Sequence, residues 1–344
     1  MPAARRARAS HPGQLLFYAA AVVTAAGLSS WISAWDDSTV GAHDAPPART
    51  AARAAPAPVA APAPREKTPG SEWLAEYAAV DAMQETTRHR LVLEQVAQRN
   101  MPDSWDDWVT VTVTGQKGTV VEFEVSPHGL RIGTTEDWVE VPLDAPHSAA
   151  AAEILGVRLA PAWMIEGIRR QARRSGGAVH YFAASEIAQA MGDHEWRRNA
   201  PDGPKMKSPE FFAQRSALLR AYLAEHGIQD GVLVSGYFKS IVPPIDGLTR
   251  RSGLEIVGGC SDQGEQIQPL SGGLHATTFY DYSHNIRLVK DGLRVNGART
   301  SFSDFSNSVR YAREFRFRRS SVPEPAYRYP EELAHWMRSR GYGR

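Results

Sequence analysis

The sequence predicts a mixed α+β fold behind an N-terminal transmembrane segment and a disordered linker. Apolar and polar residues alternate as in strands near both ends of the folded part, whereas its middle has the longer apolar spacing of helices. Strands and helices segregated in this way favour α+β over a doubly wound sheet. We divide the chain into a cytoplasmic basic segment 1–14, an apolar segment 15–35, a linker 36–70, a helix 71–100 and a globular domain 104–344.

Composition narrows the class of protein. The formal net charge is +1 and 22% of the residues are charged, so no basic field indicates nucleic acid as a partner. The single cysteine, Cys260, excludes intrachain disulfides and cysteine-rich metal sites. We expect Cys260 to be a small buried residue, with a nucleophile as the alternative.

The apolar segment 15–35 contains no charged residue and is preceded by Arg5, Arg6 and Arg8. As a helix it is long enough to cross a hydrocarbon core of about 30 Å. Basic residues on its N-terminal side alone place the N-terminus in the cytoplasm and the rest of the chain outside. We therefore expect a single-pass protein of the bacterial cytoplasmic membrane. A cleaved signal peptide, which would give a secreted protein, is the alternative.

The linker is rich in alanine and proline, above all over residues 41–69. Such a segment has too few large apolar residues to bury a core, so we expect an extended tether. At roughly 3 Å per residue, it would let the domain stand tens of ångströms from the membrane. This reach suits a protein that works on a polymer meshwork.

The folded part begins with a helix that we expect to start at Ser71 as the N-cap and to end near Arg99. Alternating residues on either side of Gly115 and Gly118 predict a β-hairpin, and two short strands follow. Helices are then predicted over 148–155, 161–174, 185–191 and 208–226, the first with Ser148 as its cap and the last with Ser208. Strands return over 231–242, 254–259, 275–289 and 292–297. The basic segment 310–321 is expected to be a solvated face.

The stretch 275–289 concentrates groups that move protons or hold anions, so we place the site within 236–290. Its predicted catalytic residues are His275, Asp281, Ser283 and His284, and its predicted substrate-binding residues are Lys239, Tyr280, Tyr282 and Arg287. In a regular strand Asp281 and His284 would point to opposite faces. They can cooperate only if the chain turns around Tyr282 and Ser283.

Three interpretations of these residues remain open. In the first, His275, Asp281 and His284 bind one zinc ion and leave a fourth position for water. In the second, a histidine oriented by Asp281 polarises a nucleophile, either Ser283 or Cys260; His275 is then the better partner for Ser283, because the adjacent side chain of His284 points away. In the third, the tyrosines, His275, Arg287 and Lys239 form a non-catalytic groove for sugar or peptide.

The segment Ser283–Leu288 resembles the S-H-G-C-x-R-L signature of the L,D-transpeptidases, which remodel peptidoglycan outside the membrane. The likeness covers Ser283, His284, Arg287 and Leu288. Ile286 stands where that family has its catalytic cysteine, so the resemblance does not imply thiol chemistry.

A wider stretch resembles an uncharacterised bacterial family with the motif D-Y-S-H-G-x-R-L-V, preceded by I-Q-P-L-S. The matching residues are 267–271, 281–284 and 287–289, whereas Asn285 replaces the glycine. This resemblance implies a recurring domain but brings no known activity.

Export, tether and site chemistry together predict an extracytoplasmic hydrolase or transferase that acts on cell-envelope material such as peptidoglycan peptides. The reaction would depend on a metal, with zinc as the candidate, or on a histidine-assisted nucleophile. The alternative is a non-catalytic envelope-binding or assembly protein. The expected partners are the inner membrane, through residues 15–35, and the cell-wall polymer. Substrate, reaction and oligomeric state do not follow from the sequence.

Overall fold

The protein is described by a computed structural model. The described residues are 66–173, 179–184, 186–187, 207–229, 232–243, 253–261, 263, 265–315, 327 and 329–342, without the side chains of 173, 253 and 268–275. They all belong to the second of two compact units, Met1–Ala60 and Ala61–Arg344. The predicted segments 1–14 and 15–35 and almost the whole linker therefore lie outside the described residues. Within the part described, no helix is both long enough and apolar enough to span a bilayer.

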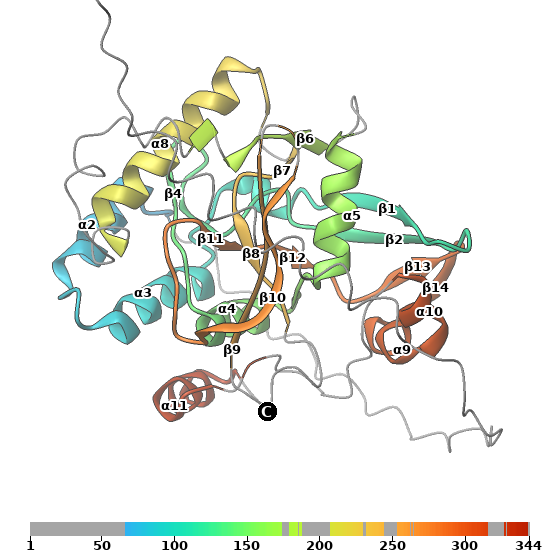
Figure 1. Ribbon diagram of the computed structural model, residues 1–344. Helices are drawn as coiled ribbons and strands as arrows, with labels where there is room; N and C mark the ends of the chain where they lie inside the picture. Colours follow the sequence, from blue (N-terminus) through green and yellow to red (C-terminus); the bar gives the residue numbers. More distant parts are fainter. Residues whose placement is uncertain are drawn as a thin grey trace, which may run out of the picture. The chain divides into compact units, whose positions relative to one another are not determined.

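The unit is a mixed α+β fold (Figure 1). Its helices are α2 (Gly70–Ala79), α3 (Glu85–Ala97), the 3-10 helix η2 (Asp103–Asp106), α4 (Ala145–Ile154), α5 (Ala162–Arg173), α8 (Pro209–Glu225), α9 (Phe302–Asn307), α10 (Val309–Glu314) and α11 (Glu331–Ser339). Its strands are β1 (Val109–Thr114), β2 (Val120–Val125), β3 (Arg131–Gly133), β4 (Trp138–Glu140), β5 (Arg158–Leu159), β6 (Val179–Tyr181), β7 (Leu233–Ser235), β8 (Lys239–Ile241), β9 (Gly253–Cys260), β10 (Gln266–Ala276), β11 (His284–Ile286), β12 (Leu288–Val289), β13 (Leu293–Val295) and β14 (Ala298–Thr300).

Two larger sheets organise the described residues, beside two pairs of strands, the antiparallel β3-β4 hairpin and the parallel pair β6-β7. A six-stranded sheet has the order β14-β13-β2-β12-β5, with β1 also paired to β2, and a four-stranded sheet has the order β10-β9-β8-β11. In the second sheet β11 runs parallel to β8, whereas β9 is antiparallel to both of its neighbours. Since β11 and β12 follow one another directly, the predicted site segment connects the two sheets.

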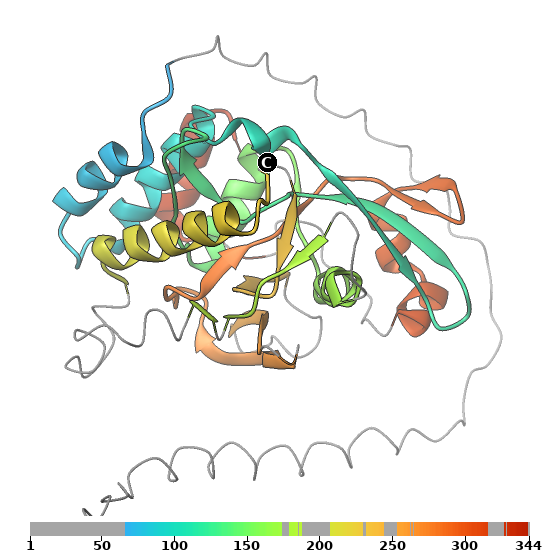
Figure 2. The ribbon, with the colours of Figure 1, turned by 90° about the horizontal axis from the view of Figure 1, so that it is seen from above.

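The hairpin of β1 and β2 forms where the sequence predicts it. Its turn closes through a hydrogen bond from Gly118 N to Gly115 O, with Gly118 at a φ of 84°. Alternate residues of β2 are buried, and α5 covers this sheet, as Figure 2 shows with α5 viewed end-on. The helix comes so close that a Cβ on Gly167 would meet Val113 at 2.4 Å, which explains the glycine in a helical segment.

The helix predicted over 71–100 is instead two helices, α2 and α3. Val80 is extended, and the Asp81 carboxylate accepts a hydrogen bond from Met83 N, which turns the chain before α3 begins. The Arg88 guanidinium then donates to Val80 O at 2.7 and 3.0 Å, which satisfies a carbonyl left free by the break.

The two predicted N-caps in the middle of the chain have different outcomes. Ser208 caps α8 as expected, since its hydroxyl accepts a hydrogen bond from Phe211 N. Helix α4 begins earlier than predicted: Asp144, not Ser148, accepts the capping hydrogen bond, from His147 N at 2.9 Å. Ser148 lies inside the helix and is fully buried. The predicted helix 185–191 falls mostly outside the described residues.

The strand predicted over 275–289 is broken. Strand β10 ends at Ala276, a turn follows, and β11 begins at His284. The helix α10 occupies part of the predicted basic face, where Arg310 and Arg313 are exposed.

Helix α11 belongs to the main core, although it lies near the C-terminus. Leu333, Trp336 and Met337 are buried in the same cluster as Trp73 and Tyr77 of α2. Residues from both ends of the described unit therefore share one core.

Candidate functional site

Four of the predicted site residues lie together at the start of β11. The turn before this strand is closed by Asp281, whose Oδ1 accepts hydrogen bonds from Ser283 N at 2.7 Å and from Ser283 Oγ at 2.5 Å. The Nε2 atom of His284 lies 3.8 Å from the same oxygen. Lys239 pairs with His284 across the parallel strands and donates its backbone N–H to Ser283 O. The turn required for Asp281 and His284 to approach each other is thus present.

The electrostatics of this group favour an ionised Asp281. Burial raises the pKa of Asp281, but electrostatic interactions with His284 and Lys239 and the hydrogen bonds from Ser283 outweigh burial and lower it below the usual 3.8. The His284 side chain is inaccessible to solvent, whereas Asp281, Ser283 and Lys239 are partly exposed. Only the last three can therefore contact a molecule outside the protein.

The other predicted residues are directed elsewhere. Tyr280 is buried beside His89, and Tyr282 packs on Phe211 with a ring distance of 4.5 Å. Arg287 is buried and donates to the carbonyls of Ser126 and Val234 at 2.8 and 2.6 Å, and burial lowers its pKa to about 10. Among the described residues Arg287 therefore holds backbone segments together, and its role in substrate binding stays a prediction. The side chain of His275 lies outside the described residues, so the zinc set with Asp281 and His284 stays a prediction.

Asn285, which departs from the glycine of the resembled family, belongs to a buried polar network around Glu140. Its Nδ2 donates to Glu140 at 3.1 Å, and its Oδ1 accepts from Leu130 N at 2.9 Å. Gly129 leaves the space for this amide, because a Cβ there would lie 2.2 Å from Asn285 Nδ2. Glu140 also accepts hydrogen bonds from Arg131, Arg215 and Tyr237.

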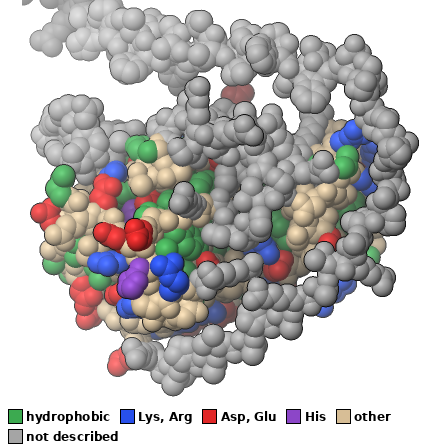
Figure 3. Space-filling model, turned by 90° about the horizontal axis from the view of Figure 1, so that it is seen from below, with side chains coloured by type: hydrophobic (Ala, Val, Ile, Leu, Met, Phe, Trp, Pro, Cys, Tyr) green, Lys and Arg blue, Asp and Glu red, His purple; other side chains and the backbone are tan. Residues whose placement is uncertain are grey.

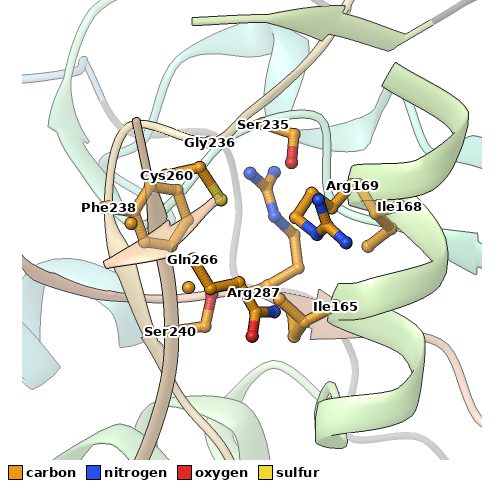
Figure 4. A pocket seen from close by; sticks show the side chains of 12 residues that line it. Ile165, Ile168, Arg169, Ser235, Gly236, Phe238, Ser240, Cys260, Gln266 and Arg287 are labelled. Atoms are coloured by element: carbon orange, nitrogen blue, oxygen red, sulfur yellow. The ribbon is translucent and has the colours of Figure 1, made fainter. Parts of the chain in front are cut away.

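A small pocket between α5 and the second sheet contains Cys260. In Figure 4 the side chain of Arg287 extends between Cys260 on one side and Arg169 on the other. The volume of about 20 Å³ holds roughly one water molecule. Arg169 is already paired with Glu166, at 2.6 Å. Cys260 is buried, and the pocket beside it has room for only about one water molecule. An organic substrate therefore cannot reach the thiol in this structure.

A second group of polar residues, which the sequence analysis did not identify, lies under the first turn of α4. Its members are His89, Asp144 and His147, all buried. Asp144 accepts from His147 Nδ1 at 2.6 Å, and its other oxygen is 3.5 Å from His89 Nδ1. Burial raises the pKa of Asp144, but the contacts with the two histidines outweigh burial and hold it well below its usual value. Burial lowers the pKa of His89.

One signal in the sequence could have drawn attention to His89. It shares a helix face with Val92, Leu93 and Val96, which are all buried. A histidine on an apolar stripe must find a polar partner inside the protein. No spacing signature connects it to Asp144, which is distant along the chain.

Comparison with protein-family models, curated proteins and solved structures gives no match to any of them. The two resemblances noted in the sequence are therefore left as expectations. Figure 3 shows charged side chains of both signs interspersed on the described part of one face.

Proposed function

We propose that the protein is an extracytoplasmic hydrolase or transferase that acts on cell-envelope material, with Ser283 as its nucleophile. In this proposal residues 15–35 anchor the chain in the cytoplasmic membrane and the linker 36–70 carries the domain toward the cell wall. The observation that carries the proposal is the hydrogen bond of 2.5 Å from the partly exposed Ser283 hydroxyl to Asp281.

Each accessible residue of the group has a role in this reaction. Ser283 Oγ would attack the carbonyl carbon of a wall peptide bond while its proton passes to Asp281, along the hydrogen bond that already exists. The C–N bond would then break, and the leaving amine would take that proton from Asp281. The acyl group on Ser283 would pass to water in a hydrolase or to an acceptor amine in a transferase. Lys239 supplies a positive charge for the developing oxyanion or for a carboxylate of the substrate. The lowered pKa of Asp281 makes it a weak base, which predicts slow turnover.

Covalent trapping tests this role of Ser283. The full-length chain in detergent is incubated with a fluorophosphonate, which labels activated serines, and the modified residue is mapped by mass spectrometry. We expect labelling at Ser283, and about 100-fold slower labelling after Asp281→Asn, since general-base catalysis is typically worth 10²–10⁴. Because the pKa of Asp281 is lowered, the rate should stay constant down to pH values near 3.8.

The control variant is Ser308→Ala, which removes a hydroxyl that caps α10 far from Asp281 in the sequence. In this variant Ser283 should be labelled as fast as in the unchanged protein. Digests of peptidoglycan should release new fragments with this control but not with Ser283→Ala. A folded protein that is never labelled at Ser283 and releases no fragments would contradict the proposal.

A second candidate is supported by the same turn. The hydrogen bond from Ser283 N to Asp281 closes an Asx turn, which a purely structural segment would contain. The protein would then bind envelope polymer without turnover, with Lys239 as a partly exposed cation for anionic groups. Sedimentation with insoluble peptidoglycan separates the two: a binder pellets with the wall, loses binding on Lys239→Gln and releases nothing.

A further inference from the structure

The buried group under α4 gathers three metal-ligand side chains from two helices. His89 comes from the middle of α3, Asp144 caps α4, and His147 lies in the first turn of α4, which packs on α3 (Figure 1). One ligand atom from each lies within 4.8 Å of the other two. The relative exposures of the three residues are 1%, 4% and 2%, so solvent does not satisfy their polar atoms.

The hydrogen bonds of the group leave ring nitrogens without partners. His147 Nδ1 lies 2.6 Å from Asp144 Oδ1, so Nε2 is the nitrogen of this ring that the carboxylate does not satisfy. That atom has no hydrogen-bond partner among the described residues, and neither nitrogen of His89 has one. Buried polar atoms are normally satisfied, so unpartnered nitrogens on two adjacent imidazoles, with ring centres 4.7 Å apart, need an explanation.

The donor set identifies the class of ligand. Calcium and magnesium prefer oxygen ligands alone, whereas two imidazoles and a carboxylate suit zinc and similar transition metals. Tyr280 packs on His89, with ring centres 4.5 Å apart. A water would complete four ligands.

We propose that His89, Asp144 and His147 bind one divalent transition-metal ion of the zinc type. Sites that are closed to solvent hold structural rather than catalytic metals. The ion would hold α3 against the start of α4. Nothing in this role requires the Ser283 reaction, so each proposal can fail without the other.

The test uses Zn²⁺ and Co²⁺ alone as probes. The full-length chain is stripped with a chelator in detergent and reloaded, and metal per chain is measured by mass spectrometry. We expect one ion per chain, a higher melting temperature on loading, and visible Co²⁺ bands typical of four-coordinate nitrogen and oxygen ligands. His89→Gln and His147→Gln should each weaken binding by at least about 10-fold.

Two histidine variants serve as controls. His128→Gln changes another buried histidine, whose nitrogens contact Ser104 and Gly129, and His226→Gln tests surface binding. Both should bind the metal as the unchanged chain does. A folded, unchanged chain that binds no stoichiometric metal would overturn the proposal, and so would equal binding by the His89 and His147 variants. The Co²⁺ spectrum needs no variant, so misfolding of the His89 or His147 variants would not obscure the answer.

Discussion

At the scale of residues, the strongest constraint is the carboxylate of Glu140. It lies at the centre of a buried network, with no exposed surface, and accepts hydrogen bonds from two arginines, Arg131 and Arg215. Removing one member of a buried ion pair leaves the other charge unpaired, which typically costs about 3–5 kcal/mol. We therefore expect Glu140→Gln to lower the free energy of unfolding by about that amount in urea titrations.

The matched control is Glu124→Gln. Glu124 pairs with Lys290 at 2.8 Å, but both side chains are more than a third exposed. Exposed pairs contribute about 0–1 kcal/mol, so this variant should be nearly unchanged. Similar losses in the two variants would show that the buried network does not hold the fold as described.

At the scale of elements, Gly133 joins the β3–β4 hairpin to the start of α2. Its φ is +125°, and a Cβ would lie 2.2 Å from Asp137 O, the carbonyl that also accepts from Gly70 N. Gly133→Ala should therefore cost about 2–5 kcal/mol, from backbone strain and overlap together. Gly292 has a similar φ of +119° in open space, so Gly292→Ala carries strain alone, about 1–3 kcal/mol. Urea titrations measure the free energy of unfolding of both variants. A larger loss for Gly292→Ala than for Gly133→Ala would contradict the role given to Gly133.

At the scale of the whole unit, α11 completes a core that begins with α2. Leu333 and Met337 have no exposed surface, and Trp73 and Tyr77 lie in the same cluster. A chain that ends at Pro330 should lose its cooperative thermal transition and its near-ultraviolet circular dichroism. A chain that ends at Tyr342 retains the helix and should melt like the full chain. An unchanged transition without α11 would show that this helix is dispensable.

Local patterns in the sequence predicted the elements whose structure depends on neighbouring residues. Alternation and two glycines give the β1–β2 hairpin, and Ser208 followed by proline gives the start of α8. The break between α2 and α3 was missed, because an apolar face continues across a turn made by one aspartate side chain. At the candidate site, the turn after Asp281 is made by neighbouring residues. The sequence indicated that Asp281 and His284 could approach each other only if the chain turned there.

Contacts between distant segments could not be predicted from one sequence. Glu140 receives hydrogen bonds from residues on α8 and β11, and His89 meets Asp144 only after α3 packs on α4. Side-chain alternation predicts that such residues are buried. Which residues they contact depends on tertiary packing. The hydrogen-bond partners of Arg287 could not be predicted for the same reason, because the two carbonyls lie in two other strand regions.

The sharing of one core by α2 and α11 also sets an order of events during synthesis. Ribosomes release a chain from its N-terminus, so Trp73 emerges more than 250 residues before Met337. Until α11 is free, the apolar face of α2 has no complete partner and stays open to wrong contacts. A nascent chain of this protein should therefore depend on a holding chaperone until its final turn is released.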